Sequence, residues 1–489
     1  MDGPMRTDPS SPPGPGRLRP PPDLPRELGD LRSSGWKSVP VAEEMRRNAE
    51  TLIAAGASIT PGVLGFEDTV IPQLENAILA GHDIILLGER GQAKTRVIRS
   101  LVGLLDEWLP TVAGSEINDD PYSPVSRASI NLVEEMGEAT PIDWVHRSHR
   151  YGEKLATPDT SIADLIGEVD PIKIAEGRYL SDELALHYGL IPRVNRGIFA
   201  INELPDLSER IQVGLLNVLE ERDVQIRGHR IRLPLDIMLV ATANPEDYTN
   251  RGRIITPLKD RFGAQIRTHY PFETMTEVKI MEAEAQLPTA GVPVVVPAYL
   301  KEVIAEVSQL ARRSTHLNQR SGVSVRLSIA NYETLVANSV RRALRTGEPV
   351  AVPRVSDLAS LIPSTQGKIE VEAMEEGHED EVVAQLVAAA ILSVFRRRVT
   401  LDDPSAIVAA FTEQVVVHAG DDLPSAAYLA VLADIPELEP PTRALAGPEA
   451  AESPALMASA LEFLLEGLHL TKRLNKDASG ARALYRGRK

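Results

Sequence analysis

Cysteine is absent from this chain of 489 residues, and aromatic residues make up only 4% of it. The absence of cysteine excludes disulfides and thiolate metal sites, so any metal must be held by oxygen or imidazole ligands. The sequence has no apolar run of the roughly eighteen residues that a membrane-spanning helix needs. Its N-terminus is rich in proline and arginine, where a signal peptide would need an apolar segment. We therefore expect a cytoplasmic protein.

Basic residues are outnumbered by acidic ones. The chain has 52 Lys and Arg against 69 Asp and Glu, which gives a formal net charge of −17 at pH 7. Proteins that neutralise nucleic-acid phosphates usually carry a basic surplus, so a nucleic-acid partner is not expected, although a local basic patch could still bind one. Hydrophobic residues make up 43% of the chain, which is enough for a buried core.

The first half of the chain changes character along its length. Proline and glycine are dense in residues 1–35, which predicts a disordered arm. Helical periodicity follows over 41–56 and 68–82. Residues 83–88 are a short apolar run that ends in glycine, which favours a buried parallel strand, and helical spacing returns over 93–109. The order is strand, glycine turn, helix.

The turn between that strand and that helix nearly matches the phosphate-binding pattern G-x-x-x-x-G-K-[ST]. In such a loop, backbone amides and the N-terminus of the following helix bind phosphate, the lysine reaches the outer phosphates, and the hydroxyl reaches magnesium. Alanine replaces the last glycine of the pattern, and we expect its φ to be negative at the turn-to-helix junction. The alternative is an accidental glycine loop. The candidate nucleotide-binding residues are Gly88, Glu89, Arg90, Gly91, Gln92, Ala93, Lys94 and Thr95.

A second strand is predicted at 198–201, and Asn202 and Glu203 follow it. This is the C-terminal strand end at which ligands collect in open α/β sheets. Glu203 is expected to orient and polarise an attacking water. Asn202 offers an acceptor oxygen but lacks the charge of an aspartate. The alternative is a core strand with a polar cap.

A third strand is predicted at 237–243, and it ends at Asn244 on the same sheet edge. A polar side chain there could hydrogen-bond the nucleophilic water. Further along, Arg261 lies near a predicted helix end and is followed by a strand-like segment at 264–270. An arginine next to an aspartate is usually a surface ion pair, so these residues alone give Arg261 no role.

The order and the residues of these motifs resemble those of the AAA+ ATPases of the magnesium chelatase ATPase-subunit and MoxR type, over about residues 65–326. The P-loop of this family commonly reads G-x-x-G-x-A-K-[ST], so Ala93 is the residue that the resemblance expects. The segments 157–171 and 189–197 resemble the long insertion of the family and the loop into the second strand. An insertion is therefore predicted near 150–190.

The resemblance implies ATP and Mg²⁺ as cofactors. Lys94 would bind phosphate, and Thr95 would bind magnesium together with Asn202, which occupies the position of an aspartate in the family. We expect Asn202→Asp to raise activity at limiting magnesium, unless an acidic neighbour such as Asp206 or a residue of the segment 164–170 already supplies the charge.

The resemblance also assigns four candidate catalytic positions. Glu203 would be the catalytic carboxylate and Asn244 the first sensor. Arg261 would be an arginine finger that acts in the site of a neighbouring subunit, which implies a ring, most often a hexamer. Arg326 resembles the second sensor, and its alternative is an arginine on the solvated face of a helix N-terminus.

The predicted architecture is an α/β AAA+ P-loop NTPase core with a parallel sheet, followed by helical domains. We place the core at 36–272, a helical lid at 273–365, a mostly helical extension at 366–470 and a mobile basic tail at 471–489. The acidic stretch near 370–381 is interpreted as a solvated face rather than a site.

Three functions remain open. The first is a ring ATPase that hydrolyses ATP to remodel or activate a partner protein, which in this family often contains a von Willebrand factor A domain. The second is the ATPase motor of a metal chelatase that inserts metal into a porphyrin, although nothing in this sequence could itself bind a porphyrin. The third is a nucleotide-binding scaffold in which Asn202 has weakened hydrolysis.

Overall fold

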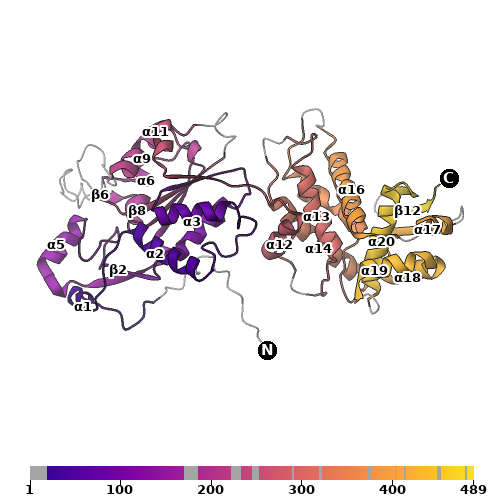
Figure 1. Ribbon diagram of the computed structural model, residues 1–489, viewed down its shortest axis with the longest axis horizontal. Helices are drawn as coiled ribbons and strands as arrows, with labels where there is room; N and C mark the ends of the chain where they lie inside the picture. The colour runs from indigo at the N-terminus through magenta and orange to yellow at the C-terminus, as the bar shows by residue number, and fades with distance from the viewer. Residues whose placement is uncertain are drawn as a thin grey trace. The chain divides into compact units, whose positions relative to one another are not determined.

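The computed structural model describes residues 19–169, 186–221, 233–244, 253–288, 291–318, 322–372, 377–401, 404–411, 415–448, 453–479 and 482–488. The chain divides into two compact units, Met1–His269 and Tyr270–Lys489 (Figure 1). The division lies close to the boundary between core and lid that the sequence predicts. Among the described residues, no helix is long and apolar enough to cross a lipid bilayer.

A five-stranded parallel sheet in the order β4-β7-β8-β1-β9 forms the centre of the first unit. The strands are Tyr151–Leu155 (β4), Gly197–Asn202 (β7), Ile237–Ala243 (β8), Ile84–Leu87 (β1) and Ala264–Arg267 (β9). Every residue of the three inner strands is buried, as their continuous apolar runs predict. Because all five strands run in one direction, their carboxyl ends share one edge. This confirms the predicted α/β core with a parallel sheet.

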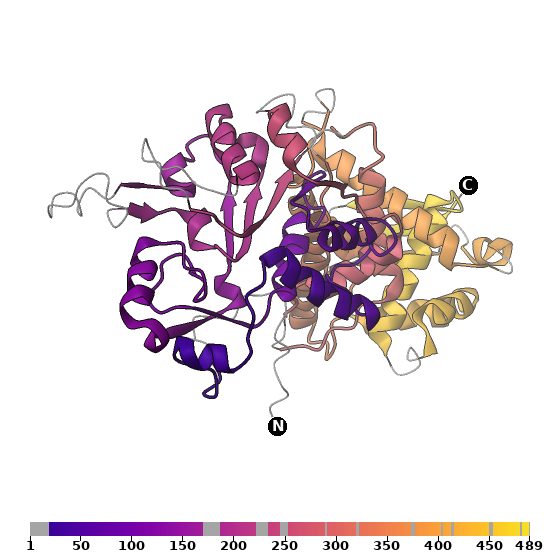
Figure 2. The same ribbon diagram turned by 60° about the vertical axis from the view of Figure 1, so that its left-hand side comes forward.

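Helices cover both faces of this sheet (Figure 1). On one face lie α2 (Val41–Ala54), α3 (Val70–Ala80) and α4 (Lys94–Ser100), and on the other lie α9 (Glu209–Glu221) and α11 (Thr256–Arg261). Ile84 and Leu86 pack with the first group, while Ile85 and Leu87 pack with the second. Alternate residues of β1 therefore face opposite layers, as the period of two in a strand requires. Figure 2 shows the strands of this sheet from a second direction.

The helix predicted over 93–109 is wrong beyond Ser100. There α4 gives way to a 3₁₀ turn, η1 (Leu101–Leu104), and then to β2 (Trp108–Val112), which pairs antiparallel with β3 (Ile142–His146). Leu101 and Leu104 fit helical spacing, but the 3₁₀ turn also buries both of them completely. The periodicity therefore located the buried positions without fixing the type of helix.

The disordered arm predicted for 1–35 is wrong at its C-terminal end. Helix α1 (Leu28–Ser33) buries Leu28 and Leu31, which are 1% and 0% exposed. The backbone amide of Leu28 donates to the carbonyl of Thr140 over 3.0 Å. Two leucines thus supply apolar contacts that offset the ordering of a proline-rich segment. Residues 1–18 of the predicted arm lie outside the described residues.

The segment after β4 carries short elements of its own, in the region where an insertion is predicted. They are α6 (Ile162–Leu165), β5 (Gly167–Val169), β6 (Leu186–Tyr188) and α8 (Leu190–Arg193). Strands β5 and β6 pair antiparallel apart from the central sheet. Residues 170–185 of the predicted insertion lie outside the described residues.

The second unit is mainly helical. Its longer helices are α12 (Thr274–Glu284), α13 (Ala298–Ala311), α14 (Arg326–Thr346), α16 (Glu379–Arg398), α18 (Ser425–Asp434), α19 (Glu439–Ala446) and α20 (Pro454–Leu470), and shorter ones are α15 (Ile362–Gln366) and α17 (Pro404–Ala410). One large hydrophobic cluster contains buried residues from Val278 to Tyr485, from the predicted lid and extension alike. The lid and the extension, predicted as two domains, therefore share a core.

The mobile basic tail predicted for 471–489 is wrong. Strands β11 (Leu474–Ser479) and β12 (Arg482–Gly487) form an antiparallel sheet with β10 (Val416–Gly420) in the order β10-β12-β11. Tyr485 is 2% exposed, and Arg482 pairs with Asp422. Tyr485 is buried on one face of β12, while Arg482 and Arg486 lie on the other face and pair with Asp422 and Asp477.

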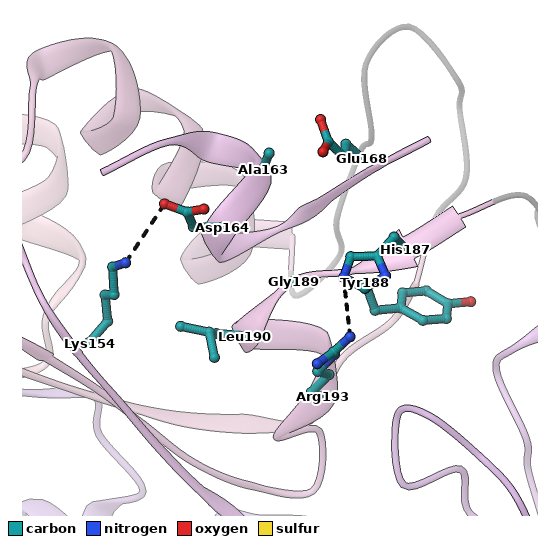
Figure 3. Close-up of a pocket in the computed structure, with 9 residues that line it drawn as sticks. All are labelled: Lys154, Ala163, Asp164, Glu168, His187, Tyr188, Gly189, Leu190 and Arg193. Carbon is teal, nitrogen blue, oxygen red and sulfur yellow. Dashed lines mark hydrogen bonds and ion pairs between the residues drawn. The ribbon is translucent and has the colours of Figure 1, made fainter. Parts of the chain in front are cut away.

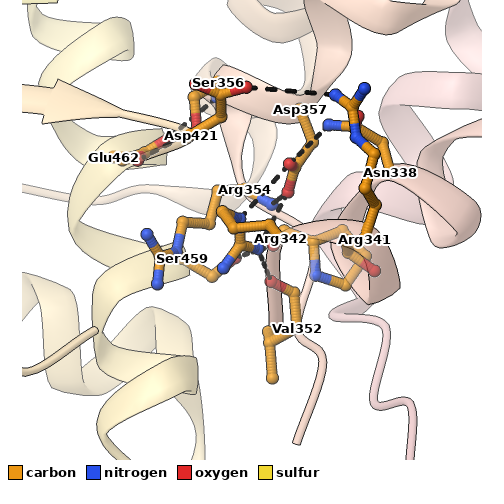
Figure 4. Close-up of polar contacts among 12 residues, drawn as sticks. Asn338, Arg341, Arg342, Val352, Arg354, Ser356, Asp357, Asp421, Ser459 and Glu462 are labelled. Atoms are coloured by element: carbon orange, nitrogen blue, oxygen red, sulfur yellow. Dashed lines mark hydrogen bonds and ion pairs between the residues drawn. The ribbon is translucent and has the colours of Figure 1, made fainter. Parts of the chain in front are cut away.

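A buried polar network joins α14, the 3₁₀ segment η7 (Val355–Leu361) and α20 in the second unit (Figure 4). Arg342 Nη2 and the backbone amide of Arg354 both donate to Asp357 Oδ2, over 2.9 and 2.8 Å. The amide of Ser356 donates to Glu462 Oε2 over 2.8 Å. Charges this deeply buried need such partners, because an unpaired buried charge is very costly.

Candidate nucleotide site

The glycine turn lies between β1 and α4, as the sequence predicts. Gly91 has a φ of 73°, which glycine adopts without the strain that a side chain would cause. A Cβ at Gly88 would collide with Thr268 Oγ1 and Gln92 Oε1, which are themselves joined by a hydrogen bond of 2.7 Å. Both glycines therefore have a geometric reason to be there, and Thr268 fixes the loop from β9's end.

Ala93 departs from its predicted conformation. Its φ is 54° and its ψ is 13°, so the negative φ expected at this junction is wrong. The residue forms the N-cap of α4 in the left-handed region, because the chain must turn back before the helix starts at Lys94. A left-handed alanine costs about 1 kcal/mol or more relative to a right-handed one. Ala93 as a whole is exposed.

Lys94 folds back over the loop. It is 7% exposed, and its Nζ donates to the carbonyl of Gly88 and, over 2.9 Å, to that of Glu89. This places the ammonium inside the turn where the predicted outer phosphates would bind. Thr95 follows in the first turn of α4 and is half-buried.

The structure brings Asn202, Glu203 and Asn244 to the same sheet edge as the loop. β7 and β8 pair in parallel with Ile201 opposite Ala241, and Asn202 and Asn244 are 8% and 5% exposed. The backbone amide of Glu203 donates to Thr242 Oγ1 over 3.0 Å, and the φ of Glu203 is 55°. Thr242 thus orients the peptide at which the chain leaves β7.

Glu153 lies two residues before the end of β4, but its side chain reaches Asn202 at this edge, and the sequence analysis missed it. Asn202 Nδ2 donates to Glu153 Oε1 over 2.5 Å, and Arg99 Nε donates to Oε2 over 2.9 Å. Burial raises the pKa of Glu153, but hydrogen bonds from Arg99, Tyr151 and Asn202 lower it, and the net pKa is below its usual value. Nothing in the sequence pattern links Glu153 to Arg99, because these residues lie 54 positions apart.

Arg261 and Arg326 lie elsewhere. Arg261 ends α11, is 42% exposed, and donates to Glu220 Oε1 of α9 over 2.6 Å. Arg326 is exposed at the start of α14. Because α14 lies within Tyr270–Lys489, Arg326 belongs to the second unit. The roles of arginine finger and second sensor both stay predictions.

The donor set suits a magnesium ion that arrives with a nucleotide. The described residues contain no group of three or more His, Asp or Glu side chains placed to hold a metal. Magnesium usually keeps several waters and takes one or two carboxylates together with substrate phosphates, so it needs no such cage. The hydroxyl of Thr95, the amide oxygen of Asn202 and the neighbouring carboxylates fit that requirement.

A cavity of about 360 Å³ lies in the insertion, away from the P-loop (Figure 3). Two polar pairs lie on its wall: Lys154 Nζ is 3.7 Å from Asp164 Oδ2, and Arg193 Nη2 is 3.3 Å from His187 Nε2. None of the residues predicted to bind nucleotide lines this cavity.

The parallel sheet, the glycine turn between β1 and α4, and the polar residues at the sheet edge fit an AAA+ P-loop core. A family model described as the Sigma-54 interaction domain matches residues 176–261, the segment that contains Asn202, Glu203, Asn244 and Arg261.

Within this class, the chain is similar to magnesium-chelatase subunits, as the sequence motifs indicate. It is 28% identical over 252 residues to subunit ChlI of Nostoc sp., covering 50% of this chain and 63% of that protein. It is 27% identical over 246 residues to the 38 kDa subunit of Rhodobacter capsulatus, covering 47% and 62%. With subunit ChlI-2 of Arabidopsis thaliana, the identity is 29% over 217 residues, covering 42% and 46%. The chain thus spans less than two thirds of the length of these relatives.

Proposed function

We propose that this chain binds ATP with Mg²⁺, hydrolyses the nucleotide, and uses the resulting conformational change to remodel or activate a partner protein. The main observation behind the proposal is that the P-loop, Asn202 and Glu203 lie at the same edge of the sheet. β1 and β7 both flank β8 in the sheet, so their carboxyl ends lie one strand apart.

Each residue has a defined task in this proposal. Lys94 offsets the charge that develops on the outer phosphates. Glu203 orients the attacking water, and Asn244 hydrogen-bonds it from the next strand. Magnesium, when bound, neutralises phosphate charge, and the Thr95 hydroxyl holds it in place.

A ring assembly follows from the task proposed for Arg261. This side chain is exposed on α11, as a residue that reaches into a neighbouring subunit must be. We propose that the chain assembles into a ring. In the proteins that it resembles, such a ring is most often a hexamer.

The proposed partner is a protein with a von Willebrand factor A domain. The second candidate is a motor for metal chelation, which the names of the magnesium-chelatase relatives favour. In that case the porphyrin would be bound by other subunits. A cytoplasmic location stays a prediction.

The variant Glu203→Gln tests hydrolysis separately from binding. The variant keeps the shape of the side chain but cannot act as a base, so it should bind ATP with the affinity of the wild type and lose hydrolysis. Calorimetry gives the affinity, and phosphate release gives the rate. If the wild type binds ATP without releasing phosphate, the chain is a nucleotide-binding scaffold.

A further inference from the structure

Glu153 is a charged side chain that no motif of the sequence explains. It projects from β4, the edge strand that pairs in parallel with β7, with Glu153 opposite Ala200 and Leu155 opposite Asn202. Its carboxylate accepts hydrogen bonds from Asn202 Nδ2 at 2.5 Å, from Arg99 Nε at 2.9 Å and Nη2 at 3.3 Å, and from Tyr151 Oη at 2.9 Å. The side chain is 20% exposed, so it is held in place while solvent still reaches it.

The amide of Asn202 is oriented to serve this carboxylate. Its Nδ2 points at Glu153, and its Oδ1 accepts a hydrogen bond from Thr242 Oγ1 over 3.3 Å. An aspartate at the same position would place a second carboxylate against Glu153, and two carboxylates at this distance repel each other. Asn202 and Glu153 therefore form a hydrogen-bonded pair in which the negative charge is on Glu153 of β4 and not on the residue at position 202 of β7.

Glu153 also faces the helix that begins at the P-loop. Ile198 and Ala200 of β7 pack with Val97 and Ile98 of α4, and Asn202 continues that face of the strand. Arg99 and Thr95 are four residues apart on α4 and hence on one face of it. Because Arg99 reaches Glu153, the face that carries the predicted magnesium hydroxyl is directed toward the Glu153–Asn202 pair.

Strand β4 is fixed firmly enough to place a functional group. Arg150, directly before it, is completely buried, and it donates to both carboxylate oxygens of Glu44 on α2 over 2.7 and 2.6 Å. Its Nε donates to the carbonyl of Arg196, which directly precedes β7, over 2.8 Å. These bonds hold β4 in register with β7.

We propose that Glu153 supplies the carboxylate of the magnesium site that Asn202 lacks, by accepting hydrogen bonds from the water shell of the ion. The proposal rests on the proposed nucleotide function. Glu153 projects from the strand next to β7, and its side chain is one methylene longer than that of an aspartate. From this position it would contact water molecules bound to the ion, of which magnesium in proteins usually keeps several. Glu153 is thus a positioning residue, and the alternative is a purely structural ion pair with Arg99.

The test measures how tightly a non-hydrolysable ATP analogue binds, by calorimetry, as Mg²⁺ is titrated from a chelated baseline. Without Mg²⁺, Glu153→Gln should bind the analogue with the same affinity as the wild type. The Mg²⁺ concentration that gives half of the increase in affinity should be about ten times higher in the variant, as for the loss of other outer-shell partners of a metal. Asp106→Asn is the matched control, because it removes another carboxylate paired with an arginine, Arg47, and should leave the Mg²⁺ dependence unchanged.

Arg99→Gln separates the two explanations. It breaks the ion pair and keeps the carboxylate, so the half-saturating Mg²⁺ concentration should stay the same or fall. A rise in the half-saturating Mg²⁺ concentration of Arg99→Gln would overturn the proposal in favour of a structural pair, and this measurement does not require Glu153→Gln to fold. An unchanged Mg²⁺ dependence in folded Glu153→Gln would also overturn it, while leaving the proposed function intact. A wild type that binds no analogue at any Mg²⁺ concentration would instead overturn the proposed function and this inference together.

Discussion

Asn202 Nδ2 donates a hydrogen bond to Glu153 Oε1 over 2.5 Å and so links β7 to β4 beside the P-loop helix. This relationship changes the expected effect of restoring an aspartate. From the sequence alone, the missing charge at position 202 argued that Asn202→Asp would help at limiting magnesium. With Glu153 beside it, the added charge brings repulsion and removes a hydrogen bond.

We therefore predict that Asn202→Asp lowers the melting temperature and leaves the half-saturating Mg²⁺ concentration unchanged or higher. The loss of stability should be about 1–3 kcal/mol, since a donor is removed and a carboxylate is placed against another. Thermal unfolding and a Mg²⁺ titration of initial ATPase rates measure the two effects. Adding Glu153→Gln to the same chain should recover the lost stability and reverse any rise in the half-saturating Mg²⁺ concentration. A half-saturation point that falls in Asn202→Asp alone contradicts the prediction.

A second prediction concerns Lys94, whose Nζ lies inside the phosphate loop. Lys94→Ala should lose nucleotide affinity by at least tenfold, because it removes the cation placed to meet the outer phosphates. Calorimetry with ATP measures the loss. Arg47→Ala removes an exposed cation of the same unit and serves as the control. Equal affinity in wild type and Lys94→Ala would show that the loop does not bind phosphate.

The left-handed φ of 54° at Ala93 gives a third prediction. Ala93→Gly should raise the stability of the nucleotide-free first unit by about 0.5–1 kcal/mol, since relief of the strain exceeds the added entropy of the unfolded chain. Ala54→Gly, at the end of α2, should instead be destabilising. Calorimetric melting of both variants checks the contrast, and a loss of stability in both would mean that Ala93 is not strained.

The residues of the site differ in how well the sequence predicts them. The P-loop, Asn202 and Asn244 follow short apolar runs bounded by glycine or polar residues, and this pattern alone places them at strand ends. Glu153 lies on an edge strand whose charges resemble a solvated face, and only the fold brings Arg99 and Asn202 to it. The φ of Ala93 and the strand at Arg482–Gly487 were also missed, because they depend on turn geometry and on partners distant in sequence.

A fourth prediction tests whether Arg261 acts in a neighbouring subunit. Arg261→Ala should reduce ATP hydrolysis by about a thousandfold or more, as expected for an arginine finger. Mixing it with Glu203→Gln subunits should restore part of the activity, because some sites then combine an intact Glu203 with an intact Arg261 from the next subunit. Glu220→Gln only removes the partner of Arg261 within the chain, so activity should persist in that variant. If mixing restores nothing, Arg261 does not act in trans.

The last prediction concerns the pH dependence of the second unit, through Glu348. This side chain is 9% exposed and accepts hydrogen bonds from Arg354 Nη2 over 3.1 Å, Arg342 Nη1 over 3.2 Å and the amide of Ser425 over 2.5 Å. Burial raises its pKa, but the hydrogen bonds of Ser425 and the charges of Arg354 and Arg342 outweigh it, so the pKa lies below its usual value.

A carboxyl group whose pKa is lower in the folded than in the unfolded state stabilises the fold above its unfolded pKa, near 4.3. That contribution is lost as the pH falls through the folded value. The wild type should therefore be more stable than Glu348→Gln at pH 7, and the difference should shrink below about pH 4. Calorimetry over this pH range measures it, and added Mg²⁺ with ATP identifies the transition of the first unit by shifting it. Glu439→Gln, in an exposed pair with Arg443, should show no such convergence. A difference between wild type and Glu348→Gln that stays constant with pH would mean that the charge of Glu348 does not stabilise this unit.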